Sequence, residues 1–177
     1  METCPDHVVL VNESDEAIGT AEKLEAHRRG LLHRAFSIFV IDDTGKLLLQ
    51  RRAASKYHSG GLWANTCCGH PRQHEKIDVA ANRRLREEMG FSCDLRHVGI
   101  FLYREPVGSG LIEHEIDHLF VGTFSGTPEA NPDEVCEWDR VAVSTVVQRL
   151  FESPDEFTAW FRAAFSHVTP YLPGQPL

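Results

Sequence analysis

The chain has 177 residues, 42% hydrophobic and 25% charged, which is typical of one soluble globular domain. Its net charge of −8 argues against a nucleic-acid partner, and an anionic ligand would need a local basic patch or a metal. No apolar run approaches the roughly 20 residues of a membrane span, and no secretion signal is expected. Five cysteines without the spacing of a disulfide framework predict a reducing, cytoplasmic location.

Strands are predicted for segments in which β-branched or aromatic residues are bounded by turn residues. The turn Asp43–Gly45 joins two of them into a hairpin, since glycine and aspartate favour tight turns. A polar loop that contains glycines covers Ser55–Gly61. The predicted strands are His7–Asn12, Ala35–Ile41, Lys46–Arg51, Val98–Tyr103 and Leu111–Thr123.

Helices are predicted from capping residues and apolar spacing. Thr20 is the expected cap of the first helix, with Lys23 on its exposed side. Gly90 ends the second, because glycine readily adopts the left-handed conformation of a helix stop. Ser153, directly before Pro154, suits the start of the last. The predicted helices are Thr20–His27, Asp78–Met89, Val143–Phe151 and Asp155–Ser166.

Mixed strands with few helices indicate an α+β layered fold. The sequence contains no internal repeat and no low-complexity linker, so residues 1–169 are predicted to form a single domain. The proline-rich tail, residues 170–177, is expected to be loose.

The most specific pattern runs from Gly69 to Phe91, G-H-P-R-Q-H-E-K-I-D-V-A-A-N-R-R-L-R-E-E-M-G-F. It resembles the Nudix box, G-x5-E-x7-R-E-U-x-E-E-x-G-U, where U is aliphatic or aromatic. Arg84 departs from the pattern, since the family's hydrolases carry a glutamate there. A guanidinium cannot hold a metal, but it can bind a phosphate through a planar fork of donors. The matching residues are Gly69, Glu75, Arg83, Leu85, Glu87, Glu88, Gly90 and Phe91.

The predicted helix of this box aligns Arg84 with Glu88 and Arg83 with Glu87, because residues four apart share a helix face. For an isolated helix, two solvated ion pairs are the simpler interpretation. The glycine, the glutamate and the helix stop at their family spacings favour a site for magnesium and phosphate instead.

Histidines and acids form a second candidate group, with His27, His33 and His70 ahead of Glu113 and Glu115. On a strand, residues two apart share a face, so both carboxylates would point the same way. Imidazoles and carboxylates together suit a divalent ion such as Mn, Mg or Zn. Among ten histidines many are simply exposed, and the assignment of the first two rests on the family resemblance given below. The histidines expected to be merely exposed are His7, His58, His97 and His167.

The segment His114–His118 matches H-E-x-x-H, the signature of zinc proteases. That signature requires a helix, whereas the apolar flanks and bracketing glycines of this segment predict a strand. On a strand Glu115 would point away from both histidines, so a metalloprotease is not favoured.

Cys67 and Cys68 precede His70 and allow three interpretations. One thiol could be buried and the other a bystander. A structural zinc site could combine both cysteines with His70 and His74, although it lacks paired C-x2-C hooks. Alternatively Cys68 acts as an acid or base at the mouth of the Nudix helix, since a thiol pKa of about 8.5 can be moved by its neighbours.

Five strings extend the likeness beyond the Nudix box: H-R-A-F-S from His33, R-R-A-x-S-K from Arg51, W-x-N-x-x-C-G-H-P from Trp63, Y-R at Tyr103 and E-H-E-I-D from Glu113. Together they resemble the type 1 isopentenyl-diphosphate isomerases over nearly the whole chain. The resemblance implies a Nudix-type α/β/α sandwich with a mixed sheet. Arginine at position 84 fits this family rather than the hydrolases.

The implied reaction moves a double bond between isopentenyl and dimethylallyl diphosphate in isoprenoid biosynthesis, by protonation and deprotonation through a tertiary carbocation. By resemblance Cys68 serves one face of the intermediate and Glu115 the other, and Tyr103 helps to pass the proton. Trp160 would stack over the cation, since an aromatic face attracts positive charge. Its apolar context, F-T-A-W-F, is also typical of core packing.

The resemblance further implies Mg²⁺ bound with the substrate diphosphate and held by Glu88, and a second divalent ion, Mn²⁺, Mg²⁺ or Zn²⁺. The implied partner is the small diphosphate, with no nucleic acid and no membrane, and the protein a monomer or weak homodimer. Each basic residue alone suits a solvated surface, and together they form an electrostatic funnel. Ligands of the second ion would be His27, His33, His70, Glu113 and Glu115; diphosphate would contact Lys23, Arg52, Lys56 and Arg84.

Two alternatives stay open from the sequence. One is a Nudix hydrolase of a nucleoside or other diphosphate, which Arg84 argues against. The other is a metal-binding protein without catalysis, which Cys68 together with Glu115 argues against.

Overall fold

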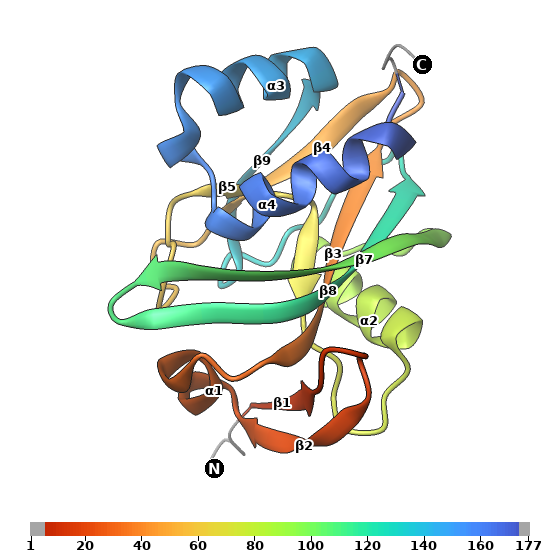
Figure 1. The fold of residues 1–177 in the computed structure, drawn as a ribbon. Helices are drawn as coiled ribbons and strands as arrows, with labels where there is room; N and C mark the ends of the chain where they lie inside the picture. Colours follow the sequence, from red (N-terminus) through yellow and green to blue (C-terminus); the bar gives the residue numbers. More distant parts are fainter. Residues whose placement is uncertain (1–5, 174–177) are drawn as a thin grey trace.

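Strand β3 (His33–Ile41) is the centre of one mixed sheet in the computed structural model, which describes residues 6–173 (Figure 1). Along one edge it pairs in parallel with β8 (Leu111–Thr123). Along the other it meets β1, β6 and β4 in turn, all antiparallel. The strands not yet bounded are β1 (His7–Val11), β2 (Ala17–Glu22), β4 (Lys46–Arg52), β5 (Trp63–Ala64), β6 (Cys67–Gly69), β7 (Leu95–Gly108) and β9 (Val135–Ala142).

Helices cover both faces of this sheet, because side chains alternate between the faces along each strand. Phe36 and Ile38 of β3 pack beneath α2 (Ile77–Met89), while Phe39 belongs to the cluster that includes Phe161 and Phe165 of α4 (Ala159–Val168). Figure 1 shows α2 and α4 on opposite sides of β3 and β8. The predicted α+β sandwich with a mixed sheet is confirmed.

Helix α2 carries the Nudix-box pattern and ends as predicted. Its apolar side packs inward, with Leu85 and Met89 fully buried. Gly90 follows with φ of 76° and donates its N–H to the carbonyl of Arg86. A Cβ at this glycine would also collide with the carbonyl oxygen of Glu129, so both conformation and space require glycine.

The first helix begins later than predicted. Helix α1 is Lys23–Arg29, because residues Ala17–Glu22 pair with β1 as strand β2. The capping side chain is that of Glu22, which accepts from the N–H groups of the next turn, and Thr20 lies within the strand. Lys23 is half-buried rather than on an exposed side. Strand pairing with β1 outweighs the local cap signal here.

Strand β9 was not predicted, since Glu137, Asp139 and Arg140 interrupt the apolar residues of its sequence V-C-E-W-D-R-V-A. It lies antiparallel to β4 over the whole length of that strand, from Lys46 opposite Ala142 to Arg52 opposite Val135. An edge strand can carry such charged residues toward solvent, and its partner supplies the hydrogen bonds. The predicted hairpin of the second and third strands is confirmed by β3 and β4.

The C-terminal part contains α3 (Val143–Glu152) and α4, with a one-turn 3-10 helix between them at Pro154–Glu156. The cap of α4 is Thr158, which accepts from the N–H of Phe161; Ser153 makes no capping bond with its side chain. A second 3-10 turn follows at Thr169–Tyr171 and leaves Leu172 buried in the core. The start of the tail expected to be loose is therefore packed, and residues 174–177 lie outside the described part. No helix of residues 6–173 is long and apolar enough to cross a membrane.

Candidate active site

Strand register gathers the predicted catalytic residues on one face of the sheet. Glu115 of β8 lies opposite His33 of β3 and opposite Tyr103 of β7, while Cys68 of β6 lies opposite Ser37 of β3. Paired residues in neighbouring strands share a face, and residues two apart along a strand do so too. This face is turned toward α4, and Cys68 packs against the hydrophobic cluster that contains Phe161 and Phe165 of that helix.

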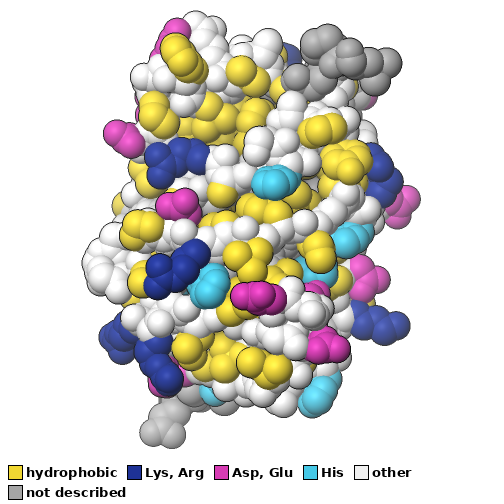
Figure 2. Space-filling view, in the orientation of Figure 1, with side chains coloured by type: hydrophobic (Ala, Val, Ile, Leu, Met, Phe, Trp, Pro, Cys, Tyr) yellow, Lys and Arg dark blue, Asp and Glu magenta, His cyan; other side chains and the backbone are white. Residues whose placement is uncertain are grey.

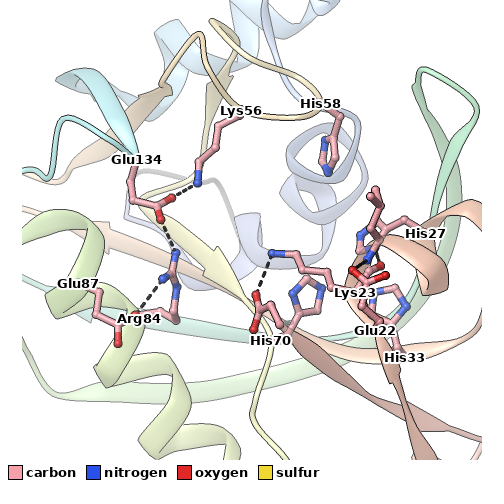
Figure 3. A network of polar contacts seen from close by, with 12 residues as sticks. Glu22, Lys23, His27, His33, Lys56, His58, His70, Arg84, Glu87 and Glu134 are labelled. Carbon is pink, nitrogen blue, oxygen red and sulfur yellow. Dashed lines mark hydrogen bonds and ion pairs between the residues drawn. The ribbon is translucent and has the colours of Figure 1, made fainter. Parts of the chain in front are cut away.

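Three histidines and a carboxylate converge at the end of this face. They come from α1, from β3, from the residue after β6 and from β8, and their ligand atoms all lie within 4.8 Å of one another. Figure 3 shows the three imidazole rings close together. The group consists of His27, His33, His70 and Glu115, all four of which were predicted.

The first two histidines are oriented as metal ligands. Nδ1 of His27 lies 2.6 Å from the carbonyl oxygen of Lys23, and Nδ1 of His33 lies 2.8 Å from that of Leu31. A carbonyl only accepts, so each Nδ1 carries the hydrogen and each Nε2 keeps a free lone pair. Both Nε2 atoms are buried without a hydrogen-bond partner among residues 6–173. Two imidazoles that are each held through Nδ1 and keep a free Nε2 lone pair are suited to bind a divalent ion.

His58 was expected to be exposed, and this expectation is wrong. It is 7% exposed, and its Nε2 lies 3.5 Å from Oε1 of Glu113. With His27 and Glu113 it forms a second group of potential ligands. Burial lowers the pKa of His58 to about 3, so the ring is neutral at physiological pH. His7, His97 and His167 are exposed, as expected.

Tyr103 joins the two carboxylates. Its hydroxyl oxygen lies 2.6 Å from an oxygen of Glu113 and 2.6 Å from an oxygen of Glu115. Burial, together with the charge of Glu115, raises the pKa of Glu113 well above its usual range. Burial has the same tendency at Glu115, but the imidazoles of His33 and His70, whose Nε2 atoms lie 3.2 Å and 2.9 Å from its Oε1, hold the pKa of that carboxyl well below its usual range. One phenol hydrogen cannot serve two carboxylates, so a second shared proton suits this arrangement.

The adjacent cysteines point to opposite faces. Cys67 lies opposite Ile38 and is fully buried under α2, whereas Cys68 lines a cavity on the other side. Burial raises the pKa of the Cys68 thiol, so it holds its proton at neutral pH. His74 is exposed, and no described group of potential metal ligands contains a cysteine. The structural zinc site considered from the sequence is not assembled.

The H-E-x-x-H residues lie on a strand, as predicted. Nδ1 of His114 lies 3.0 Å from the carbonyl oxygen of Gly30, and His118 contacts His97 and Asp15. Both histidines thus face away from the carboxylate of Glu115. The segment does not have the geometry of a zinc protease.

The predicted cations reach the same cavity, which has a volume of about 270 Å³. Lys23, Arg52, Lys56 and Arg84 all line it, and so do Cys68, Glu88, Glu113, Glu115 and Trp160. On the face drawn in Figure 2, by contrast, Lys and Arg side chains lie scattered among acidic and apolar ones. The cavity therefore brings the predicted cations together, and carboxylates such as Glu87, Glu88 and Glu134 line it beside them.

Acidic partners hold these cations. Arg84 pairs with Glu88 and Arg83 with Glu87, which confirms the two contacts expected from helix spacing, and Arg84 also contacts Glu87. Glu88 is buried, and its other oxygen accepts a 2.8 Å hydrogen bond from Gln50. The guanidinium of Arg52 lies 4.9 Å from the ring centre of Trp160, which is itself buried in the core.

Gly69 allows α2 to approach the strand that carries Cys68. A Cβ at this position would lie 3.0 Å from the ring of Phe36 and 3.1 Å from Cγ of Arg84. A larger residue would require Phe36 or Arg84 to shift by a few tenths of an ångström. The first glycine of the box therefore has a spacing role rather than a turn role.

Similar proteins were found at the level of both sequence and fold. The NUDIX domain model matches residues 31–161. Isopentenyl-diphosphate Delta-isomerase 2 of Aromatoleum aromaticum is 59% identical over 75% of this chain and 70% of its own length. Isopentenyl-diphosphate Delta-isomerase of Pectobacterium atrosepticum is 46% identical over 93% of this chain and 92% of its own length.

The solved structures support the fold alone, at low sequence identity. DR0079 from Deinococcus radiodurans superimposes with a TM-score of 0.75 at 20% identity, over 96% of this chain and 100% of its own. The two relatives named above match more than two thirds of this sequence, and both belong to the family that its motifs predict. The chain therefore belongs to the Nudix family and, within it, to the isopentenyl-diphosphate Delta-isomerases.

Proposed function

We propose that this protein interconverts isopentenyl diphosphate and dimethylallyl diphosphate, as the names of its relatives indicate for them. The substrate is thus a small diphosphate with an apolar five-carbon tail. The observation that carries the proposal is that Cys68 and Glu115 line one cavity from strands on opposite sides of β3.

The chemistry requires an acid and a base. A proton adds to the terminal carbon of the alkene and leaves a tertiary carbocation. A different proton then leaves the carbon that adjoins the cationic centre on the diphosphate side, and the new double bond forms there. Each direction of this reversible reaction uses one of Cys68 and Glu115 as the acid and the other as the base. The hydroxyl of Tyr103, 2.6 Å from Glu115, is suited to help that carboxyl exchange its proton.

The wall of the cavity suits a carbocation. Trp160 lines it, and its indole already attracts positive charge, since the Arg52 guanidinium lies over the ring. An apolar tail between Cys68 and Glu115 would exclude water, which would otherwise capture the carbocation. The roles of Trp160 in the core and in the site are compatible.

The cations of the cavity are suited to bind the diphosphate end of the substrate. We assign Lys23, Arg52, Lys56 and Arg84 to the diphosphate and Glu88 to the Mg²⁺ that accompanies it. The binding energy of this end would position the tail for reaction.

The histidine group is suited to a second divalent ion, Mn²⁺, Mg²⁺ or Zn²⁺, with Glu113 beside it. When bound, such an ion adds positive charge next to Glu115 and lowers its affinity for a proton. The open Nε2 lone pairs of His27 and His33 support this assignment.

The test is an assay of the purified protein with isopentenyl diphosphate and Mg²⁺, followed by NMR. We expect dimethylallyl diphosphate to form without release of phosphate, and a chelator to stop the reaction. Release of phosphate from nucleoside diphosphates without isomerisation would contradict the proposal and favour the hydrolase. Arg84, paired with Glu88 where hydrolases carry a carboxylate, argues for the first outcome.

A further inference from the structure

A carboxylate lies between two of the cations assigned to the diphosphate. Glu134, directly before β9, accepts a hydrogen bond from Nζ of Lys56 through Oε2, and its Oε1 lies 3.4 Å from Nη2 of Arg84. Figure 3 shows both cationic side chains directed at this carboxylate. All three residues line the cavity that also contains Cys68 and Glu115.

The backbone holds Glu134 in this position. Its N–H donates to the carbonyl of Asn131 at 3.0 Å, and its own carbonyl accepts from the N–H of Ala53 at 2.9 Å. The N–H of Lys56 in turn donates to the carbonyl of Ala53. The backbones of Glu134 and Lys56 are thus both hydrogen-bonded to Ala53, which holds the two residues beside each other.

The side chains are partly buried, with Glu134 21%, Lys56 22% and Arg84 23% exposed. Hydrogen bonding by Lys56 and the charge of Arg84 overcome the effect of burial and lower the pKa of Glu134, so it is ionised at neutral pH. Partly buried charges are screened less by salt than charges at an open surface. The carboxylate is therefore an effective partner for both cations.

Two oxygens that each contact one cation resemble two oxygens of a phosphoryl group. A substrate diphosphate that binds Nζ of Lys56 and Nη2 of Arg84 would compete with this carboxylate, because both donors are now directed at Glu134. Arg84 also donates to Glu88 and Glu87, so Lys56 is the cation that depends most on Glu134. We propose that Glu134 occupies the place of a phosphoryl group in the free protein and competes with the diphosphate for Lys56 and Arg84. This inference rests on the proposed function, in which those two cations bind the substrate.

Such a competitor has a use in this reaction. Substrate and product carry the same diphosphate, so contacts to it bind both equally and tighter contacts would slow product release. Without substrate the carboxylate also separates two cations that would otherwise repel each other.

The experiment is titration calorimetry with inorganic pyrophosphate, with and without Mg²⁺, on the wild type and on Glu134→Gln. Glutamine has nearly the same shape but no charge. We expect pyrophosphate to bind about threefold to tenfold more tightly to the variant in both conditions, the effect of losing about one partly screened ion pair. KM for isopentenyl diphosphate should fall by a similar factor.

Glu137→Gln is the matched control, since Glu137 lies on β9 and pairs with Arg51, neither of which lines the cavity. Its affinity for pyrophosphate should equal that of the wild type. Glu134→Asp is a second variant that keeps the charge but is too short to reach both cations, and it should give a smaller gain. Thermal unfolding of each variant confirms that it is folded.

Unchanged or weaker binding of pyrophosphate by folded Glu134→Gln would overturn the inference while leaving the isomerase intact. Weaker binding in Mg²⁺ alone would overturn it too, because Glu134 would then be a ligand of the ion. A wild type that neither binds pyrophosphate nor isomerises the substrate would remove both the inference and the proposed function.

Discussion

The two faces of the sheet use the same residue types for different purposes. On the face toward α4, His33, Cys68 and Glu115 line or adjoin the cavity. On the opposite face, Cys67, one residue before Cys68, packs under α2, and His118, three residues after Glu115, pairs with Asp15. The side-chain period of two along a strand separates these neighbours completely. A shift of register by one residue would exchange the two sets, so the pairing of β3 with β6 and β8 determines which of them can react.

The largest expected difference between the two faces is that between the adjacent cysteines. Cys68→Ala should lower kcat by about 100-fold to 10,000-fold, the usual contribution of an acid or base, with little change in KM. Cys67→Ala should retain kcat, because its thiol faces the core under α2, and should lose about 1 kcal/mol of stability. NMR assays and urea unfolding measure the two effects. A fully active Cys68→Ala protein would contradict the catalytic assignment.

Metal binding gives the second comparison, between His33 and His118. His33→Ala removes an open Nε2 and should weaken binding of Mn²⁺ by at least about 100-fold, whereas His118→Ala on the opposite face should leave it unchanged. His58→Ala should have an intermediate effect, since its Nε2 lies 3.5 Å from Glu113. Calorimetry or competition with a fluorescent chelator measures these affinities. Equal losses of Mn²⁺ affinity for His33→Ala and His118→Ala would contradict the difference between the two faces.

Tyr103→Phe tests a smaller effect on the reactive face. It keeps the buried ring and removes the hydroxyl that contacts Glu113 and Glu115. We expect kcat to fall about tenfold, the equivalent of one hydrogen bond to a charged group. Leu102→Ala, at an exposed position on the other face of β7, is the control and should leave kcat unchanged. An unaffected Tyr103→Phe variant would show that the hydroxyl has no part in proton exchange.

Local pattern was sufficient to predict much of this site. The period of a strand predicted that Glu113 and Glu115 share a face and that His114 and His118 lie on the other. The spacing of the Nudix box predicted the helix, its end at Gly90 and the contact of Arg84 with Glu88. In each case neighbours within four residues determine the geometry.

His58 and Glu134 could not be predicted in this way. His58 lies in an irregular loop, and it is buried only because that loop reaches Glu113 and the edge of the Trp160 ring, far along the sequence. Glu134 precedes β9, whose three charged residues interrupt the strand pattern. Their positions depend on contacts between distant segments, and no periodicity within the sequence reports these.

The smallest expected effect concerns pH and the histidine of the opposite face. Burial lowers the pKa of His118 below its usual 6.5, although Asp15 acts in the other direction. The unfolded chain therefore binds the proton more readily, so stability is complete above the usual pKa and declines as pH falls below it. His118→Gln can still donate to Asp15 but cannot be protonated, and between about pH 7.5 and about pH 5 it should lose less stability than the wild type. The difference should be about 1 kcal/mol or less, measured by urea unfolding with a chelator present to remove the metal contribution. His167→Gln, exposed on α4, should follow the wild type, and a steeper decline for His118→Gln would contradict the sign of the shift.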